Sequence, residues 1–227
     1  RSIMSKYADF QDKPINKTLS YIHWFFISNI YFALCNILLM LSLYLFDIKF
    51  ENIAIFFLAL IPTGPSLCAL CSFMNKLIRD KYVDTTRDFF KGYVENFKAS
   101  LKFWCIFLLL SFILIFDLKL CLMNRKFIFL IIPMIFMLLF LIILCSYSIP
   151  ILSKYEIKLL DNIKLSFYLA LKTPIKTLLN LVIIALSAYI FLYISNIIGL
   201  FVFSLSSYIL MKNMASCFLF IESKYLK

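Results

Sequence analysis

The chain has 227 residues, of which 63% are hydrophobic and 15% are charged, and its formal net charge is +11. Soluble domains carry about 25% charged residues, so this composition excludes a soluble globule and fits a membrane protein with several spans. The apolar runs are continuous rather than alternating, which favours helices over a β-barrel. The positive charge lies mostly between these runs, as the positive-inside rule produces, and does not indicate nucleic-acid binding.

Six apolar segments are predicted to span the membrane. They cover about residues 22–46, 53–78, 101–116, 127–152, 175–195 and 198–221. Only the neighbourhood of Asn196 and Gly199 separates the last two, and one helix of their combined length would be about 70 Å long, more than twice a bilayer. We therefore expect a turn there. The predicted fold is all-α, with a single integral membrane domain over residues 1–227.

The second segment contains Pro62, Thr63, Gly64 and Pro65 near mid-membrane. Both prolines lack an amide hydrogen and clash with the preceding turn, and Gly64 adds flexibility, so we predict that this helix is broken at Pro62–Pro65. Two interpretations remain open. The break is a kink that shapes helix packing, or it is an unwound segment that faces a solute or an ion, as in transporters.

The segment after the second span is predicted to form an amphipathic helix, capped by Asp84 or Thr85. Its aromatic residues recur at helical spacing beside charges of both signs. The pattern is typical either of a helix lying in the lipid headgroups or of a surface that binds another protein. A catalytic site is disfavoured because no nucleophile and base are grouped there. The candidate docking residues are Arg87, Asp88, Phe89, Phe90, Tyr93, Asn96, Phe97 and Lys98.

The segment after the fourth span is predicted to form a second amphipathic helix of similar design. Ser153-Lys-Tyr-Glu156 matches a capping box, and Thr173-Pro174 is expected to end the helix. One face carries Ile157, Leu160, Lys164, Phe167 and Leu171. Both long segments between spans are thus expected to be helical.

The distribution of Lys and Arg predicts the orientation. Nineteen of the 23 lie in the N-terminal segment, in or beside the two long segments between spans, or near the C-terminus, and four lie in the other loops. The positive-inside rule therefore places both termini and both amphipathic helices in the cytoplasm of a multi-pass plasma-membrane protein. The first residue, Arg1, suggests a trimmed or tagged start.

Few polar residues fall inside the spans, and no chain of carboxylates does, which disfavours an ion-coupled pump. Neither a nucleotide-binding loop nor a hydrolase motif occurs, so no catalytic or cofactor-binding residues and no cofactor are assigned. Cys68 and Cys71 form a CxxC on a predicted helix, but with a single histidine in the chain we interpret them as packing residues rather than metal ligands. The intramembrane polar residues are His23, Asn29, Asn36, Asn180, Asn213 and Lys212.

Two neighbouring motifs, Thr63-Gly64-Pro65 and the aromatic block from Arg87 to Lys98, resemble the YesL family of bacterial membrane proteins. The resemblance covers roughly residues 60–102. The chain departs from the family pattern at Ser66 and Cys68, where alanine is common, and lacks the usual aromatic residue before Arg87.

Members of that family are encoded beside permeases of carbohydrate ABC transporters. The resemblance therefore implies a non-catalytic accessory or regulatory subunit for sugar uptake, in the bacterial plasma membrane, with membrane lipids and ABC permease subunits as partners and no nucleic acid. The alternative is a stand-alone small-solute transporter or channel that uses the broken second helix. A membrane sensor or assembly factor is a weaker alternative, because the external loops are short.

Overall fold

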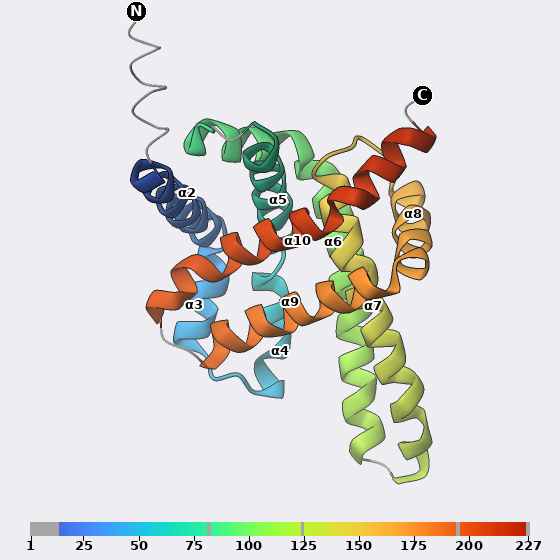
Figure 1. Cartoon of the computed structure of the whole chain (residues 1–227). Coiled ribbons are helices and arrows are strands. Elements are labelled where there is room, and N and C mark those ends of the chain that lie inside the picture. Colours follow the sequence, from blue (N-terminus) through green and yellow to red (C-terminus); the bar gives the residue numbers. More distant parts are fainter. Residues whose placement is uncertain (1–13, 81–82, 124, 194–195, 226–227) are drawn as a thin grey trace, which may run out of the picture.

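The computed structural model of the chain describes residues 14–80, 83–123, 125–193 and 196–225, and all regular structure in this part of the chain is helical (Figure 1). The elements are α2 (Pro14–Cys35), α3 (Ile37–Leu45), η1 (Phe50–Asn52), α4 (Ile53–Ala59), α5 (Thr63–Asp80), α6 (Thr85–Met123), η2 (Arg125–Leu130), α7 (Ile131–Leu152), α8 (Leu159–Lys172), α9 (Pro174–Tyr193) and α10 (Asn196–Tyr225).

The predicted class of fold, a polytopic helical membrane protein, is confirmed. Among the described residues, four helices are long and apolar enough to cross a membrane, and two bent pairs of helices raise the number to six if each pair is one span. The four helices cover residues 85–123, 127–152, 174–191 and 201–224, and the bent pairs cover residues 18–45 and 50–80. These positions match the six predicted segments.

The helices are arranged around α5. Figure 1 shows α6 and α7 as a long hairpin that extends beyond the other helices, while α9 and α10 form a second hairpin that crosses them. Helix α5 packs against α6 most extensively, and also against α2, α7 and α10. The largest buried side chains of the core come from α5, α6, α7, α8 and α10, and they include Phe73, Phe89, Tyr147, Leu169 and Met214.

The predicted break in the second span is present, but it lies earlier than expected. Helix α4 ends at Ala59 and α5 begins at Thr63, with a bend of 50° between them. Thr63, Gly64 and Pro65 therefore form the first turn of α5 rather than an unwound segment. The first turn of a helix tolerates proline because its amides have no partner within the helix. The amide of Ser66 makes the first regular bond, to the carbonyl of Pro62 (3.2 Å).

A second break, which the sequence analysis did not predict, divides the first span. Helices α2 and α3 are bent by 70° at Asn36. Here the amide of Asn36 donates to the carbonyls of both Phe32 and Ala33, at 3.1 and 3.0 Å. Two neighbouring spans are thus broken.

Two long segments rich in lysine follow the second and the fourth span, and they differ in how they join the next span. The segment after the second span is helical, as predicted, and its candidate docking residues continue without a break into the third span, so that both belong to one helix, α6, of 39 residues. No proline or glycine follows Gly92 in this stretch, so nothing interrupts it. The second amphipathic helix, α8, is separate as predicted, and Thr173 divides it from α9.

The predicted capping box for α8 was wrong. Helix α7 continues through Pro150 to Leu152, and the hydroxyl of Ser153 donates to the carbonyl of Pro150 (2.7 Å). Ser153 thus closes α7, and α8 begins six residues later, at Leu159, without a side-chain cap.

Candidate functional site at two helix breaks

The breaks in the first two spans meet at one buried polar cluster, which we call the break junction and define as Asn36, Thr63 and Ser66. The side-chain amide of Asn36 donates to Ser66 Oγ (2.8 Å), and Thr63 Oγ1 donates to Asn36 Oδ1 (2.7 Å). All three residues are buried. Sequence analysis singled out Thr63 as part of the break and Asn36 as an intramembrane polar residue, but it did not bring them together.

The junction also satisfies the backbone on both sides. The Asn36 amide donates to the carbonyl of Phe32 (2.8 Å), and Ser66 Oγ lies 3.0 Å from the carbonyls of both Pro62 and Thr63. A buried polar group without a partner costs roughly 1–3 kcal/mol. Because these groups satisfy one another, the bend of the first span is fixed to the bend of the second.

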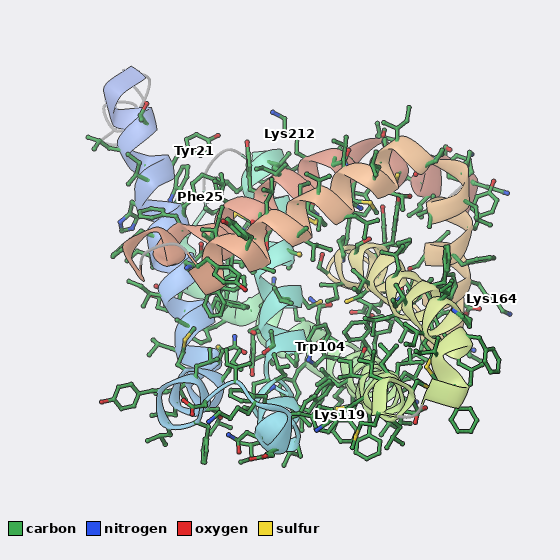
Figure 2. All side chains as sticks on the ribbon, turned by 90° about the horizontal axis from the view of Figure 1, so that it is seen from below. Tyr21, Phe25, Trp104, Lys119, Lys164 and Lys212 are labelled. Atoms are coloured by element: carbon green, nitrogen blue, oxygen red, sulfur yellow. The ribbon has the colours of Figure 1, made fainter. Side chains whose placement is uncertain are left out.

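Helix α6 contacts the break directly through Trp104. Its indole Nε1–H donates to the carbonyl of Leu60 (2.7 Å), within the three residues that separate α4 from α5. A Cβ atom added to Gly64 would lie 2.2 Å from Trp104 Cγ. Glycine is therefore needed at this position for space rather than for flexibility. Figure 2 labels Trp104, which lies where α6 passes the broken second span.

The chemical capacity of the junction is limited because its polar groups are occupied by one another. The neighbouring cavity, of about 330 Å³, lies between α4 and α6 and is apolar, with Phe57, Ile61 and Leu108 in its lining. Within the part of the chain that the structure describes, no three His, Cys, Asp or Glu side chains are grouped closely enough to hold a metal ion. The side chains of the break junction therefore hold the two bent spans together.

The other end of α5 and α6 carries an ion pair that joins the two helices. Lys76 Nζ lies 2.6 Å from Asp88 Oδ1, and the second oxygen of Asp88 accepts the amide of Asp84 (3.0 Å). Asp84 in turn accepts the amide of Arg87 (3.2 Å), so the predicted cap of this helix by Asp84 is confirmed. Asp88 is only 9% exposed, and both of its carboxylate oxygens have partners within the protein.

The candidate docking residues all lie in the first turns of α6, but only some reach the surface. Asp88 and Phe89 are buried, the latter beside Tyr31 of α2, so these two do not form a docking surface. Gly92 is also buried, and a Cβ atom there would lie 3.0 Å from Ser72 of α5. The half-buried members are Tyr93, Asn96 and Phe97, and the exposed members are Arg87, Phe90 and Lys98.

The exposed surface of this part of α6 includes a stripe of residues one turn apart that sequence analysis identified only in part. Phe90 is 40% exposed, and Val94, one helical turn later, is 73% exposed. Lys98 continues the stripe after one more turn. Val94 was not among the predicted residues, although its spacing from Phe90 and Lys98 was visible in the sequence. We call Phe90, Val94 and Lys98 the α6 stripe.

A polar cleft of about 450 Å³ opens beside this stripe, between α5, α6 and the linker between α7 and α8. Its lining includes Lys76, Glu95, Asn96 and Tyr155. The linker is tied to α10, because Glu222 accepts hydrogen bonds from Lys154 (2.8 Å) and from the hydroxyl of Tyr155 (3.0 Å). Burial, together with this carboxylate, raises the pKa of Tyr155, so its hydroxyl remains a donor.

Fold and site together define a polytopic α-helical membrane protein whose first two spans are broken and joined at one polar junction. The model of a family described as "Protein of unknown function, DUF624" matches residues 21–118. This range begins within α2 and includes the bends of both broken spans, the break junction and most of α6, and it excludes α7 to α10. No match was found among curated proteins or among solved structures.

Proposed function

We propose that this chain is a non-catalytic accessory or regulatory membrane subunit of a carbohydrate ABC transporter. The family that we propose for it is YesL, which is consistent with the match to a domain of unknown function over residues 21–118. The carbohydrate and the ABC permease come from the family resemblance alone. The mechanical part of the proposal is supported by the geometry of α6.

One observation carries this mechanical part: a single unbroken helix joins an exposed stripe to the break. Trp104, which donates to Leu60, lies fourteen positions after Phe90 on α6, or about 21 Å along the helix axis. A partner that displaces the α6 stripe therefore also displaces the indole that holds the second span in its bent form. Coupling of this kind needs a rigid element between two sites, and α6 provides it.

The proposed partner surface is the α6 stripe, on the side that the lysine distribution assigns to the cytoplasm. Phe90 and Val94 present apolar area, and Arg87 and Lys98 beside them are exposed cations. Such a surface suits a permease loop or helix with apolar and acidic residues. The proposed surface omits Asp88 and Phe89 from the predicted docking residues, because both are buried.

The test is co-purification with a carbohydrate ABC permease from the same organism, expressed together with this chain. Tagged wild-type protein should retain the permease in mild detergent, and Phe90→Ala combined with Val94→Ala should weaken retention by about tenfold or more, as expected for an apolar anchor. The matched control is Leu109→Ala with Ile113→Ala, two exposed residues farther along the same helix. Absence of the permease from wild-type preparations would refute the proposal.

A second candidate is a stand-alone transporter or channel that uses the broken second span. Broken helices in neighbouring spans are typical of transporters, and this observation favours the candidate. The occupied hydrogen-bonding groups of the break junction and the apolar cavity beside it count against it. Liposomes that contain only this protein distinguish the two proposals, because a transporter takes up solute there and an accessory subunit does not.

A further inference from the structure

The apolar cavity between α4 and α6 is a groove that runs along both helices, and we call it the α4–α6 groove. Its wall on the second span consists of residues spaced three, one and three positions apart, as on one side of a helix: Ala54, Phe57, Leu58 and Ile61. The wall on α6 repeats this spacing between positions 105 and 112. Two walls of this length enclose a hollow about 10 Å long.

The groove is open on its outer side and closed at its floor. Leu58 and Leu109 form its two rims and are 67% and 60% exposed, whereas Leu108 at its floor is only 7% exposed. The rings of Phe57 and Phe112, one from each wall, are in contact with their centroids 5.1 Å apart. Packed side chains therefore keep the walls at a fixed separation and leave the hollow between the rims.

The groove faces the hydrocarbon layer of the membrane. In the second span, no charged residue occurs between Glu51 and Lys76. In the third span, none occurs between Lys102 and Asp117. The lining side chains are those of alanine, leucine, isoleucine, phenylalanine and cysteine, which offer water too few hydrogen bonds. An unfilled hollow loses dispersion contacts, so its occupant comes from the apolar part of the membrane.

The size of the groove favours a hydrocarbon chain over a helix. Its volume is about 330 Å³, whereas a helical segment of the same length occupies roughly 800 Å³. An apolar cavity of about 150 Å³ holds a six-carbon ring, so the groove has room for roughly 12 carbon atoms. An extended chain contacts both walls along its length and buries more apolar area than it does on a convex helix surface.

We propose that the α4–α6 groove binds one acyl chain of a membrane lipid. The chain enters at Ala54, the end of the groove that lies three positions from the charged Glu51, and passes between Leu58 and Leu109. Its terminal carbons contact Ile61, which belongs to the segment between α4 and α5. The lipid thus contacts the break of the second span. The proposal is independent of the family resemblance and of the permease contact at the α6 stripe.

The test measures quenching of Trp104 fluorescence by phosphatidylcholine with brominated acyl chains, in bilayers that contain the full-length protein. Trp24→Phe leaves Trp104 as the single tryptophan, because the chain has two. Trp104 is 7% exposed, and its indole donates to the carbonyl of Leu60, next to Ile61 of the groove. Bromine quenches only at short range, so a chain in the groove should quench this indole. Quenching should rise in proportion to the fraction of brominated lipid, as expected for one chain within reach.

The variant that separates the groove from the general lipid surface is Cys105→Phe, made in the Trp24→Phe background. The added ring occupies the volume that the acyl chain needs, and quenching should fall by about half or more. The matched control is Ile106→Phe, at the next position of α6, which is 40% exposed and lies outside the groove. This control should leave quenching unchanged. If Cys105→Phe does not fold, Ala54→Phe at the entrance makes the same test from the opposite wall.

Three outcomes would overturn the proposal. Equal quenching in Cys105→Phe and Ile106→Phe would mean that the groove holds no chain. An unquenched Trp104 in the wild-type groove would mean that a second copy or another protein covers it. If the unquenched fluorescence falls with a higher power of the fraction of non-brominated lipid, several boundary chains reach Trp104 and none is held in the groove.

Discussion

The two buried asparagines Asn36 and Asn162 differ in how the protein uses them. Each has no exposed surface. Asn36 donates and accepts hydrogen bonds with two residues of the neighbouring span, whereas both side-chain atoms of Asn162 lack a partner among the described residues. The first therefore fixes the relative position of two bent helices, and the second weakens the contact between α8 and α7.

The same contrast separates the two lysine-rich segments, which looked alike in sequence. The first turns of α6 bury Asp88 and Phe89 against α5 and α2, with an ion pair and a cap in place. Helix α8 buries Asn162 and Ser166 beside Leu169 and exposes Leu160 and Leu171. One segment is built into the helix bundle and the other faces outward. Substitutions should therefore have large effects in the first region and small or opposite effects in the second.

The largest effect is expected for Gly64→Ala. The new methyl group would lie 2.2 Å from Trp104 Cγ, so α6 must move away from the break, at a cost of about 3 kcal/mol. Thermal unfolding in detergent can be followed with a thiol-reactive dye that reports exposure of the buried Cys68 and Cys71, in a Cys105→Ser background because Cys105 is exposed.

The matched control is Gly92→Ala, where the nearest atoms, in Ser72, lie at 3.0 Å. Its cost should be offset by the higher helix propensity of alanine, about 1 kcal/mol. A second check uses Trp104→Gly, which removes both nearest side-chain atoms, Cγ at 2.2 Å and Cβ at 2.3 Å. Combined with it, Gly64→Ala should cause little further loss, and an additive loss would contradict the assigned contact.

A smaller loss, of about 2 kcal/mol, is expected for Asn36→Leu. Leucine has a similar volume but leaves the hydroxyls of Thr63 and Ser66 without their partner in the first span. The same dye assay measures the change. Double-mutant cycles with Thr63→Val should show coupling, since the two side chains share one hydrogen bond. Independent effects would mean that the two breaks are not joined through Asn36.

Much of the fold could be predicted from sequence, because its determinants are local. Long apolar runs define the spans, prolines indicate the break in the second span, and Asp84 caps α6 through a residue three positions away. The bend at Asn36 could not be predicted in this way. Neither proline nor glycine lies there, and its partners Thr63 and Ser66 are 27 and 30 residues away.

The candidate docking set shows a similar limit. Periodicity placed Phe89 and Phe90 in one amphipathic segment. Which of the two side chains is buried depends on the helix that packs against this segment. Tyr31 of α2 lies against both rings, and Phe89 is fully covered while Phe90 is not. The pairing of Asp88 with Lys76 likewise depends on how α5 and α6 pack. Sequence alone identified the right region and could not assign its inner and outer sides.

An intermediate effect is expected for Asp88→Asn, which removes the charge that holds Lys76. Because Lys76 is partly exposed, the loss should be about 1.5 kcal/mol rather than the larger value of a fully buried pair. The comparison is Glu95→Gln, since Lys91 and Glu95 form an exposed pair at 3.8 Å and its removal should change stability by less than about 0.5 kcal/mol. Equal effects would place Asp88 at the surface.

The smallest effect, and the one of opposite sign, is expected for Asn162→Leu. Replacing a buried amide that has no partner by an apolar side chain of similar volume removes a desolvation cost, so stability should be unchanged or increase by about 1 kcal/mol. The dye assay compares this variant with Asn36→Leu in the same background. A loss as large as that of Asn36→Leu would show that Asn162 has a polar partner when the protein is folded. A gain would mean that its inner face holds α8 less firmly than an apolar face does, so that contacts on the outer face matter more for its position.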